Sequence, residues 1–456
     1  MMELAGKKVL VFGAGVSGVS AAQVLQEQGA LVTLADGKEQ QQVKAAAGLE
    51  GVAGKVTLAM GRQDEALLDG KELLILSPGI SINHPLVQSA DARSIPVWSE
   101  IELAGILCRA PMIAVTGTNG KTTTTTLIGE MMKTTFSEVV VGGNIGAALS
   151  HEVRNITQEG RVVAEISSFQ LEAIHSFHPQ IAVMLNLTPD HIDRHGSFEG
   201  YGATKERIFV NQTRQDFAVL NHDDEWVKDM ASRVQSQVFF FSRRTELDQG
   251  AFISNGNICL RWNGRADKVC AITDMKLFGG HNVENALAAC SAAYLGGVSP
   301  QNMARVLTSF TGVEHRIEPV ATRNGVTYYN DSKATNPESS IKALEAFAGH
   351  IILIAGGRDK NTDLSEMMSL ARDRVDLMIL IGEATERFEE AARKQGVRNI
   401  FRAPTLEAAV EKAKAEAAAP QVVLLSPACA SYDMFDNYEQ RGRVFKELVL
   451  QGADQA

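Results

Sequence analysis

The stretch AVTGTNGKTTTTTLIGEMM, residues 114–132, joins the end of a hydrophobic strand to a glycine-containing turn and the start of a helix. The backbone amides of such a turn, with the N-terminus of the following helix, can hold a phosphate group. The common phosphate-loop pattern begins with a glycine that four residues separate from its Gly-Lys pair, but Val115 occupies that position and the first glycine is Gly117. The sequence therefore predicts a phosphate site of shorter spacing, in which Lys121 contacts phosphate oxygens and the Thr122 hydroxyl contacts Mg²⁺. A strand-to-helix turn without a ligand is the alternative.

Length and composition limit the kind of protein. The chain has 456 residues, which is too long for a single core. Its composition, 45% hydrophobic and 21% charged residues, is ordinary for a globular protein. A formal net charge of −10 argues against broad nucleic-acid or anionic-membrane binding. The five cysteines lack metal-ligand spacing, and no run of 18 apolar residues or signal-peptide pattern is present. We expect a cytoplasmic protein with reduced thiols.

Short apolar runs alternate with helical patterns in three successive blocks, as in parallel sheets covered by helices. We therefore predict an α/β protein of three domains, 1–105, 106–311 and 312–456. The first and third are expected to be Rossmann-like, and the central one P-loop ATPase-like. In the central block, AFISNGNICLRWNGRADKV at 251–269 alternates apolar and polar residues around two Asn-Gly turns, which predicts a small antiparallel flap.

The first block contains a second glycine-rich turn between a strand and a helix, GAGVSG at 13–18. Gly13, Gly15 and Gly18 would let the backbone approach a diphosphate, with Val16 and Ser17 opening the helix. Asp36 ends the next strand, where a ribose-binding acid would stand. The pattern indicates a nucleotide diphosphate in general. It does not distinguish a dinucleotide from another nucleotide, and a turn without ligand is the alternative.

Further polar side chains follow strand ends in the central and third blocks. Glu165 ends the run RVVAE and His191 lies in the loop NLTPDHIDRH, so with a loop hydroxyl they could form a Mg²⁺ site. The third block places charged and hydroxyl groups in loops, and the candidates there are Arg316, Asp331, Lys333, Lys360 and Ser426. Each of these residues alone could equally be a surface or paired residue.

The motifs GTNGKTT, AEISSFQLE, NLTPDHIDRH, GGHNVENALAA, EHRIE, NDSKATN and LLSPACASYDMF together resemble those of the Mur ligases. The resemblance extends along the whole chain, and SSFQLE and SPACASYDMF resemble the members that add D-glutamate. It implies three domains, for a UDP-linked substrate, for ATP, and for ATP with the amino acid. The implied small-molecule partners are UDP-N-acetylmuramoyl-L-alanine, D-glutamate and ATP, with two Mg²⁺ ions. It implies no nucleic-acid or membrane partner, and a monomer.

The resemblance also implies roles for single residues. The residues implied for ATP are Gly117, Thr118, Asn119, Gly120, Lys121, Thr122, Thr123, Asn282, Arg316, Asp331 and Lys333. Those implied for the UDP-linked substrate are Gly13, Gly15, Val16, Ser17, Gly18, Asp36, Asn144, Ser167 and Gln170. Those implied for D-glutamate are His191, Thr335, Lys360, Ser426 and Phe435. The implied metal ligands are Thr122, Glu165, His191 and a carbamylated Lys205, and the implied catalytic residues are Lys121, Asn144, His191 and Lys205. By its local pattern alone, Lys205 would be an exposed helix lysine.

The implied reaction activates the substrate carboxylate by phosphorylation from ATP, and the amine of D-glutamate then displaces phosphate. Other enzymes remain possible at this point: a sibling ligase that adds another amino acid, or a folylpolyglutamate synthetase, which should lack a UDP domain. A nucleotide-binding sensor that uses residues 13–18 for NAD is the alternative outside enzymes. It would leave the motifs of Lys121, Glu165 and Lys333 without a role.

Overall fold

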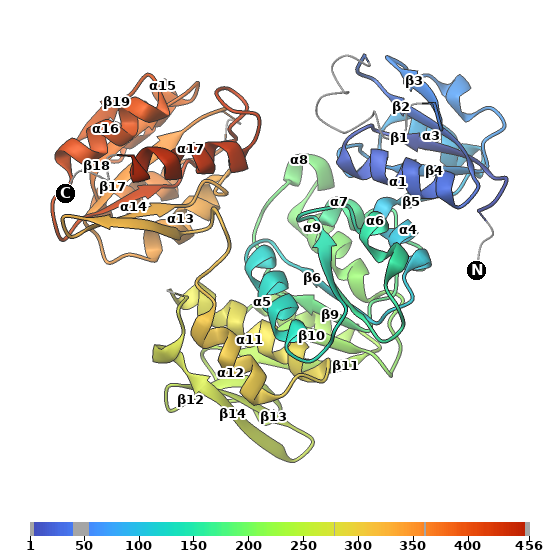
Figure 1. The fold of residues 1–456 in the computed structure, drawn as a ribbon, viewed down its shortest axis with the longest axis horizontal. Helices are drawn as coiled ribbons and strands as arrows, with labels where there is room; N and C mark the ends of the chain where they lie inside the picture. Colours follow the sequence, from blue (N-terminus) through green and yellow to red (C-terminus); the bar gives the residue numbers. More distant parts are fainter. Residues whose placement is uncertain (1–3, 40–53, 278, 360–361, 452–456) are drawn as a thin grey trace. The chain divides into compact units, whose positions relative to one another are not determined.

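The computed structural model describes residues 4–39, 54–277, 279–359 and 362–451. These described residues form three separate β-sheets (Figure 1). The sheets have five, nine and six strands. The chain divides into two compact units, Met1–Met275 with Glu284–Thr308, and Lys276–Val283 with Ser309–Ala456. The predicted α/β class is confirmed, while the boundaries near residues 105 and 312 stay predictions. No helix among the described residues is long and apolar enough to span a membrane.

The N-terminal sheet has the strand order β3-β2-β1-β4-β5, and all of its pairings are parallel. Its strands are β1 (Lys8–Phe12), β2 (Leu31–Asp36), β3 (Thr57–Met60), β4 (Leu73–Leu76) and β5 (Val97–Ser99). Its helices are α1 (Val16–Glu27), η2 (Glu65–Leu68), α3 (Pro85–Ala92) and α4 (Glu100–Leu107). Alternate residues of β1 enter different cores, because Val9 packs with the α1 side and Leu10 with the α3 side. Both faces of this parallel sheet are therefore covered.

The central sheet has the order β14-β13-β12-β11-β10-β9-β6-β8-β7. Its parallel strands are β6 (Met112–Thr116), β7 (Val139–Gly143), β8 (Arg161–Glu165), β9 (Ile181–Met184), β10 (Phe217–Asn221) and β11 (Gln237–Ser242). β12 (Gly250–Ser254), β13 (Asn257–Trp262) and β14 (Arg265–Ala271) then pair in antiparallel fashion. The antiparallel flap predicted at 251–269 is thus confirmed, and it extends the sheet through β11.

The helices of this part follow the strands closely. Short 3₁₀ turns lie among them, namely η3 (Val153–Asn155), η4 (Arg207–Phe209), η5 (Met230–Ser232) and η6 (Ile272–Asp274). The α-helices are α5 (Lys121–Lys133), α6 (Leu149–Glu152), α7 (Ser168–Leu171), α8 (Ile192–His195), α9 (Phe198–Glu206), α10 (Glu225–Asp229), α11 (Gly280–Leu295) and α12 (Pro300–Ser309). In the sheet, β6 pairs with β8 on one side and with β9 on the other. The segment that leads from β8 to β9 therefore takes the chain from one side of β6 to the other. Ligands of α/β sheets bind at the carboxyl ends of strands beside such a reversal of order.

The C-terminal sheet has the order β15-β16-β20-β17-β18-β19, parallel except for the β15–β16 hairpin. Its strands are β15 (Glu318–Arg323), β16 (Val326–Asn330), β17 (Ile351–Gly356), β18 (Val375–Ile381), β19 (Ile400–Arg402) and β20 (Val422–Leu425). Its helices are α13 (Pro337–Glu345), α14 (Ser365–Arg374), α15 (Thr385–Lys394), α16 (Leu406–Glu416) and α17 (Tyr438–Leu450). Leu353 packs with the α14 side and Ile354 with the α17 side, so this sheet also has a core on each face.

Candidate active site

The turn between β6 and α5 has a backbone that its two glycines make possible. Gly117 has φ +147° and Gly120 has φ +86°, conformations that side chains with a Cβ rarely adopt. A Cβ on Gly120 would lie 2.2 Å from Asn285 Oδ1, and one on Gly117 would lie 2.9 Å from the Cβ of Leu185. The turn is therefore held against its neighbours by close backbone approach, at the N-terminus of a thirteen-residue helix.

The loop after β9 fixes the shape of this turn. Asn119 N donates to Asn186 Oδ1 at 2.8 Å, and Asn186 Nδ2 donates back to Asn119 O at 3.0 Å. Thr118 and Thr188 form a similar pair, since the Thr118 hydroxyl donates to Thr188 O at 3.1 Å and accepts from Thr188 N at 3.0 Å. Sequence reasoning missed Asn186 and Thr188, although both lie in the NLTPDHIDRH motif that it singled out. Their side chains and backbone build the turn.

Two lysines converge on one carbonyl oxygen of the turn. Lys121 Nζ and Lys205 Nζ each donate to Gly117 O at 2.9 Å, and Lys121 Nζ also donates to Thr118 O at 2.8 Å. Lys205 lies on α9 and is only 1% exposed, so the local-pattern interpretation of an exposed helix lysine is wrong. Burial, followed by the charge of Lys121, holds the pKa of Lys205 well below its usual value. The positive charge of Lys121 at this turn favours an anion.

Glu165, at the end of β8, is buried, and its charge acts on the ammonium group of Lys205. Asn144 Nδ2 donates to Glu165 Oε1 at 3.0 Å, and Asn144 N donates to Glu165 O at 2.8 Å. Glu165 Oε2 is buried and has no hydrogen-bond partner among the described residues. A buried carboxylate oxygen without a donor is costly unless a cation completes it, so the residues present fit a Mg²⁺ ion.

His191 is more exposed than Glu165, with 48% of its side chain accessible. It has φ +51° at the start of α8, and its Nε2 lies 3.5 Å from Asp190 Oδ2. Its ring packs on that of Phe169, with centroids 4.7 Å apart. Asp190 is a carboxylate that sequence reasoning missed, although the motif contains it. The loop presents an imidazole and a carboxylate next to α7.

Ser167 and Gln170, predicted to bind the UDP-linked substrate, form the N-terminal cap of α7. Gln170 N donates to Ser167 Oγ at 3.3 Å, and Ser167 N donates to Gln170 Oε1 at 2.9 Å. This reciprocal pair satisfies backbone donors that the helix leaves open. The cap fixes the segment between Glu165 and Phe169, and the substrate-binding role of the two residues stays a prediction.

The first glycine turn is as tightly built as the second. A Cβ on Gly18 would lie 1.8 Å from Gly13 O, and a Cβ on Gly13, which has φ +100°, would lie 2.6 Å from the Cβ of Ser77. Asp36 accepts from Ala14 N at 2.7 Å and from Lys38 N at 2.8 Å, so its carboxylate holds the turn in place. Helix α1 begins at Val16 without a side-chain cap, after Gly15. Its first amides, including that of Ser17, could hold an anion.

In the C-terminal unit, Asp331 follows β16 and is fully buried. Its carboxylate accepts from Ser426 Oγ at 2.8 Å and from Ile317 N at 3.2 Å, and Arg316 Nη1 lies 3.7 Å from it. Burial raises the pKa of Asp331 to about 6, against the opposing effect of Arg316. The Ser426 hydroxyl also contacts Ser340 Oγ at 2.9 Å, so Ser426 supports Asp331.

The other residues predicted to bind ligands in this unit make the following contacts. Lys333 Nζ lies 5.7 Å from the ring centroid of Tyr438, and Thr335 N donates to Lys333 O at 2.9 Å. Phe435 is half-buried against the core beneath α17. Asn282 N bonds to Gly279 O in the first turn of α11, and Lys360 lies outside the described residues. The roles assigned to all of these residues stay predictions.

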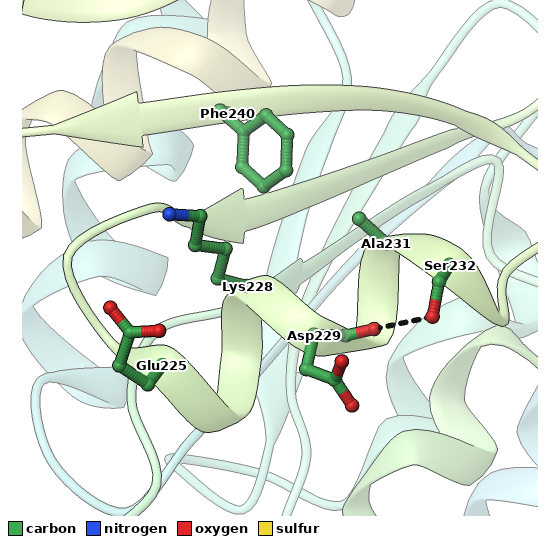
Figure 2. Close-up of a pocket in the computed structure, with 6 residues that line it drawn as sticks. All are labelled: Glu225, Lys228, Asp229, Ala231, Ser232 and Phe240. Carbon is green, nitrogen blue, oxygen red and sulfur yellow. Dashed lines mark hydrogen bonds between the residues drawn. The ribbon is translucent and has the colours of Figure 1, made fainter.

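Figure 2 shows a hollow of about 340 Å³ elsewhere, between α10 and β11. Its lining is Glu225, Lys228, Asp229, Ala231, Ser232 and Phe240. The Ser232 hydroxyl donates to the Asp229 carbonyl at 2.9 Å, and a dashed line marks this bond in Figure 2. Gly117, Lys121, Glu165, His191 and Lys205 are not among these lining residues.

Three family models match along the chain: the Mur ligase MurD-like, N-terminal domain at 7–99, the Mur ligase middle domain at 115–293, and the Mur ligase, glutamate ligase domain at 315–429. A protein of a Thermoanaerobacter species named UDP-N-acetylmuramoylalanine--D-glutamate ligase is 46% identical over 453 residues, 99% of each chain. A protein of the same name from Koribacter versatilis is 44% identical over 454 residues, which is 100% of this chain and 99% of that one.

Solved structures share the fold at low sequence identity. UDP-N-acetylmuramate-alanine ligase of Thermotoga maritima has a TM-score of 0.59 at 20% identity, covering 97% of this chain and 98% of that one. A pseudomurein peptide ligase of Methanothermus fervidus has a TM-score of 0.59 at 18% identity, covering 97% and 99%. The chain belongs to the Mur ligase family of ATP-dependent, Mg²⁺-requiring amide ligases, as the sequence motifs predicted.

Proposed function

We propose that this chain joins the amino group of D-glutamate to the terminal carboxyl group of UDP-N-acetylmuramoyl-L-alanine, with ATP converted to ADP and phosphate. This would be a step of peptidoglycan synthesis, carried out in the cytoplasm by a monomer. The relatives with 46% and 44% identity over nearly the whole chain bear the name of this activity. The observation that carries the chemistry is the convergence of Lys121 and Lys205 on the carbonyl of Gly117.

The reaction needs activation because a carboxylate has no good leaving group. A carboxylate oxygen of the substrate attacks the γ-phosphorus of ATP, ADP leaves, and an acyl phosphate results. The amine of D-glutamate then attacks the acyl carbon, phosphate leaves, and the nitrogen loses a proton to give the amide. Lys121 lies where it can move from the carbonyls of Gly117 and Thr118 onto phosphate oxygens. Its charge would stabilise the transferring phosphoryl group.

Glu165, Thr122, His191 and Lys205 would hold two Mg²⁺ ions. When bound, Mg²⁺ neutralises charge on the phosphates and polarises the phosphoryl oxygens. The orphaned Glu165 Oε2 supports this assignment, as does Asn144, whose bond to Glu165 Oε1 orients the carboxylate and leaves Oε2 for the metal.

Lys205 would act as its carbamate. Burial lowers the pKa of Lys205 and so favours the neutral form of its amine, whose nitrogen would form a bond to the carbon of CO₂ while one proton is released. The resulting carbamate anion would supply an oxygen ligand where the lysine alone supplies none. Incubation with ¹³C-bicarbonate tests this step, because a carbamate resonance should be present in the wild-type protein and missing from Lys205→Met.

The remaining predicted residues would divide by substrate. The turn at 13–18 would hold the diphosphate of the UDP-linked substrate, because α1 begins there with open amides. Asn282, Arg316, Asp331 and Lys333 would contact ATP. Thr335, Lys360, Ser426 and Phe435 would contact D-glutamate.

Phosphate release tests the proposal. Purified protein is given ATP, Mg²⁺ and UDP-N-acetylmuramoyl-L-alanine, with D-glutamate added or withheld. Release that depends on D-glutamate, and is absent with L-glutamate or lysine, is the expected result. Release with another amino acid would move the chain to a sibling activity. No release with any amino acid would remove the UDP-linked substrate from the proposal.

A further inference from the structure

Arg194, on α8, contacts the loop between β4 and α3 of the N-terminal part although it belongs to the central part of the chain. Its Nη1 donates to Pro78 O at 3.1 Å and its Nη2 donates to Ile80 O at 2.9 Å. These carbonyls lie just after β4, in the loop that leads to α3. The arginine thus bonds across 116 and 114 residues of sequence to backbone carbonyls of this loop.

The same guanidinium is fixed from its other side by a carboxylate. Arg194 Nε donates to Glu172 Oε1 at 2.9 Å and Nη2 donates to Glu172 Oε2 at 2.5 Å. The two side chains are 12% and 5% exposed. A bidentate pair with so little solvent contact defines both the position and the plane of the arginine. The guanidinium carbon also lies 4.0 Å from the ring centroid of Phe169.

The loop that Arg194 binds is the one that supports the first glycine turn. Ser77 N donates to Phe12 O at 3.0 Å. A Cβ built on Gly13 would lie 2.6 Å from Ser77 Cβ and 3.1 Å from Ile80 Cγ1. Residues 77–80 therefore touch the backbone of the turn proposed to hold the UDP diphosphate, and a shift of this loop would move that turn.

On the central side, aromatic rings continue from Arg194 toward the phosphate turn. Phe169 packs on His191 at 4.7 Å between ring centroids and on His195 at 5.8 Å. His195 in turn packs on Tyr201 at 5.4 Å.

Tyr201 then meets the phosphate turn itself. Its hydroxyl lies 3.2 Å from Thr118 Oγ1, and Lys205 Nζ lies 4.8 Å from the centroid of its ring. Side chains in contact thus extend from residues 77–80, through Arg194 and these rings, to the turn at 117–120.

We infer that Arg194 is a positioning residue that couples the binding of the UDP-linked substrate to the binding of ATP and Mg²⁺. The inference rests on the proposed function for the identity of the two ligands. A ligand that fixes the position of the turn at 13–18 also fixes residues 77–80, which contact it. Arg194, bonded to residues 77–80, then holds Phe169 and His191 in place. Lysine cannot replace arginine here, because one ammonium group cannot hold two carbonyls and both oxygens of Glu172 in a single plane.

A binding cycle measures this coupling in the full-length protein. Calorimetry gives the Kd of the non-hydrolysable analogue AMP-PNP with Mg²⁺, alone and with saturating UDP-N-acetylmuramoyl-L-alanine. The ratio of the two values is the coupling factor, which by linkage is the same in the reverse titration. The variants are Arg194→Lys and Glu172→Gln. The matched control is Arg207→Lys, because Arg207 donates to Leu171 O at 2.9 Å and Ile174 O at 2.8 Å within the central part only.

We expect a coupling factor of about 5 to 150 in the wild type and in Arg207→Lys. We expect a factor near 1 in Arg194→Lys, with Glu172→Gln also reduced. The KM for the UDP-linked substrate should rise roughly tenfold in Arg194→Lys, a loss of a size that such coupling produces, while the KM for D-glutamate should not change. A factor near 1 in the wild type, or an unchanged factor in Arg194→Lys, would overturn the inference. Failure of the wild type to bind the UDP-linked substrate at all would instead overturn the proposed function and, with it, this inference.

Discussion

The buried carboxylate of Asp331 is expected to lower the stability of the C-terminal unit while it serves the ligase activity. Its pKa is raised to about 6 in the folded protein, mainly by burial, whereas the pKa of an aspartate in an unfolded chain is about 3.9. A group whose folded pKa is raised binds its proton more tightly when folded. Its ionised form therefore costs stability above both pKa values, and the cost disappears as the pH falls below both.

The magnitude follows from the two pKa values. A difference of about two units corresponds to roughly 3 kcal/mol at pH 7.5, at about 1.4 kcal/mol per unit. The same linkage leaves about 1.5 kcal/mol at pH 5 and less than about 1 kcal/mol at pH 4. Asp331→Asn keeps an oxygen that can accept from Ser426 Oγ or Ile317 N and removes the charge. It should stabilise the unit at pH 7.5 by up to this amount and abolish ligase activity.

Hydrogen exchange can follow this unit by itself. The three tryptophans, Trp98, Trp226 and Trp262, all lie outside it, so their fluorescence reports the other unit. The opening free energy is measured on amides of β16 and β20 between pH 7.5 and pH 5. The control is Asp373→Asn, because Asp373 is exposed and the side-chain bond to Arg372 lowers its pKa. The reasoning is refuted if Asp331→Asn is less stable than the wild type at pH 7.5, or if its gain does not shrink at lower pH.

Three further outcomes are expected. Gly18→Ala should raise the KM for the UDP-linked substrate by about 5- to 150-fold, since its Cβ would lie 1.8 Å from Gly13 O and overpacking of this kind costs about 1–3 kcal/mol. Steady-state kinetics with unchanged circular dichroism would check it. Glu165→Gln should raise the Mg²⁺ concentration for half-maximal activity by at least about 10-fold, measured by Mg²⁺ titration. Lys205→Met should lower kcat by about 10–100-fold and remove any dependence of the rate on added bicarbonate, which a rate measurement in CO₂-depleted buffer would show.

Much of the fold could be predicted from local sequence. The apolar run before Gly13 and the glycines after it are sufficient for a strand, a turn and a helix, and β1 and α1 lie where they were expected. The alternation around two Asn-Gly pairs predicted the antiparallel flap, which the structure confirms as β12 to β14. These features depend on side-chain period and on backbone torsions, and both are properties of short segments.

The candidate site depended on more distant relations. Gly117 and Lys121 were recognisable because they follow β6, and Glu165 because it ends β8. The parallel sheet brings the carboxyl ends of these two strands together. Asn186 and Asp190 were missed, although they lie in a quoted motif, because nothing in their spacing distinguishes a residue that shapes a turn from one in a solvated loop.

The sequence by itself determined where strands and helices follow one another along the chain, and where the two glycine turns lie. These features follow from the residues of each segment. Only the tertiary structure decided that Lys205, 88 residues from Gly117, is buried against its carbonyl. In the same way, only the fold brought Arg194 to Pro78 and left one oxygen of Glu165 without a donor in the part of the chain that the structure describes. Burial and long-range contact set the pKa values and the electrostatics of the site, and neither is encoded in the local period of the chain.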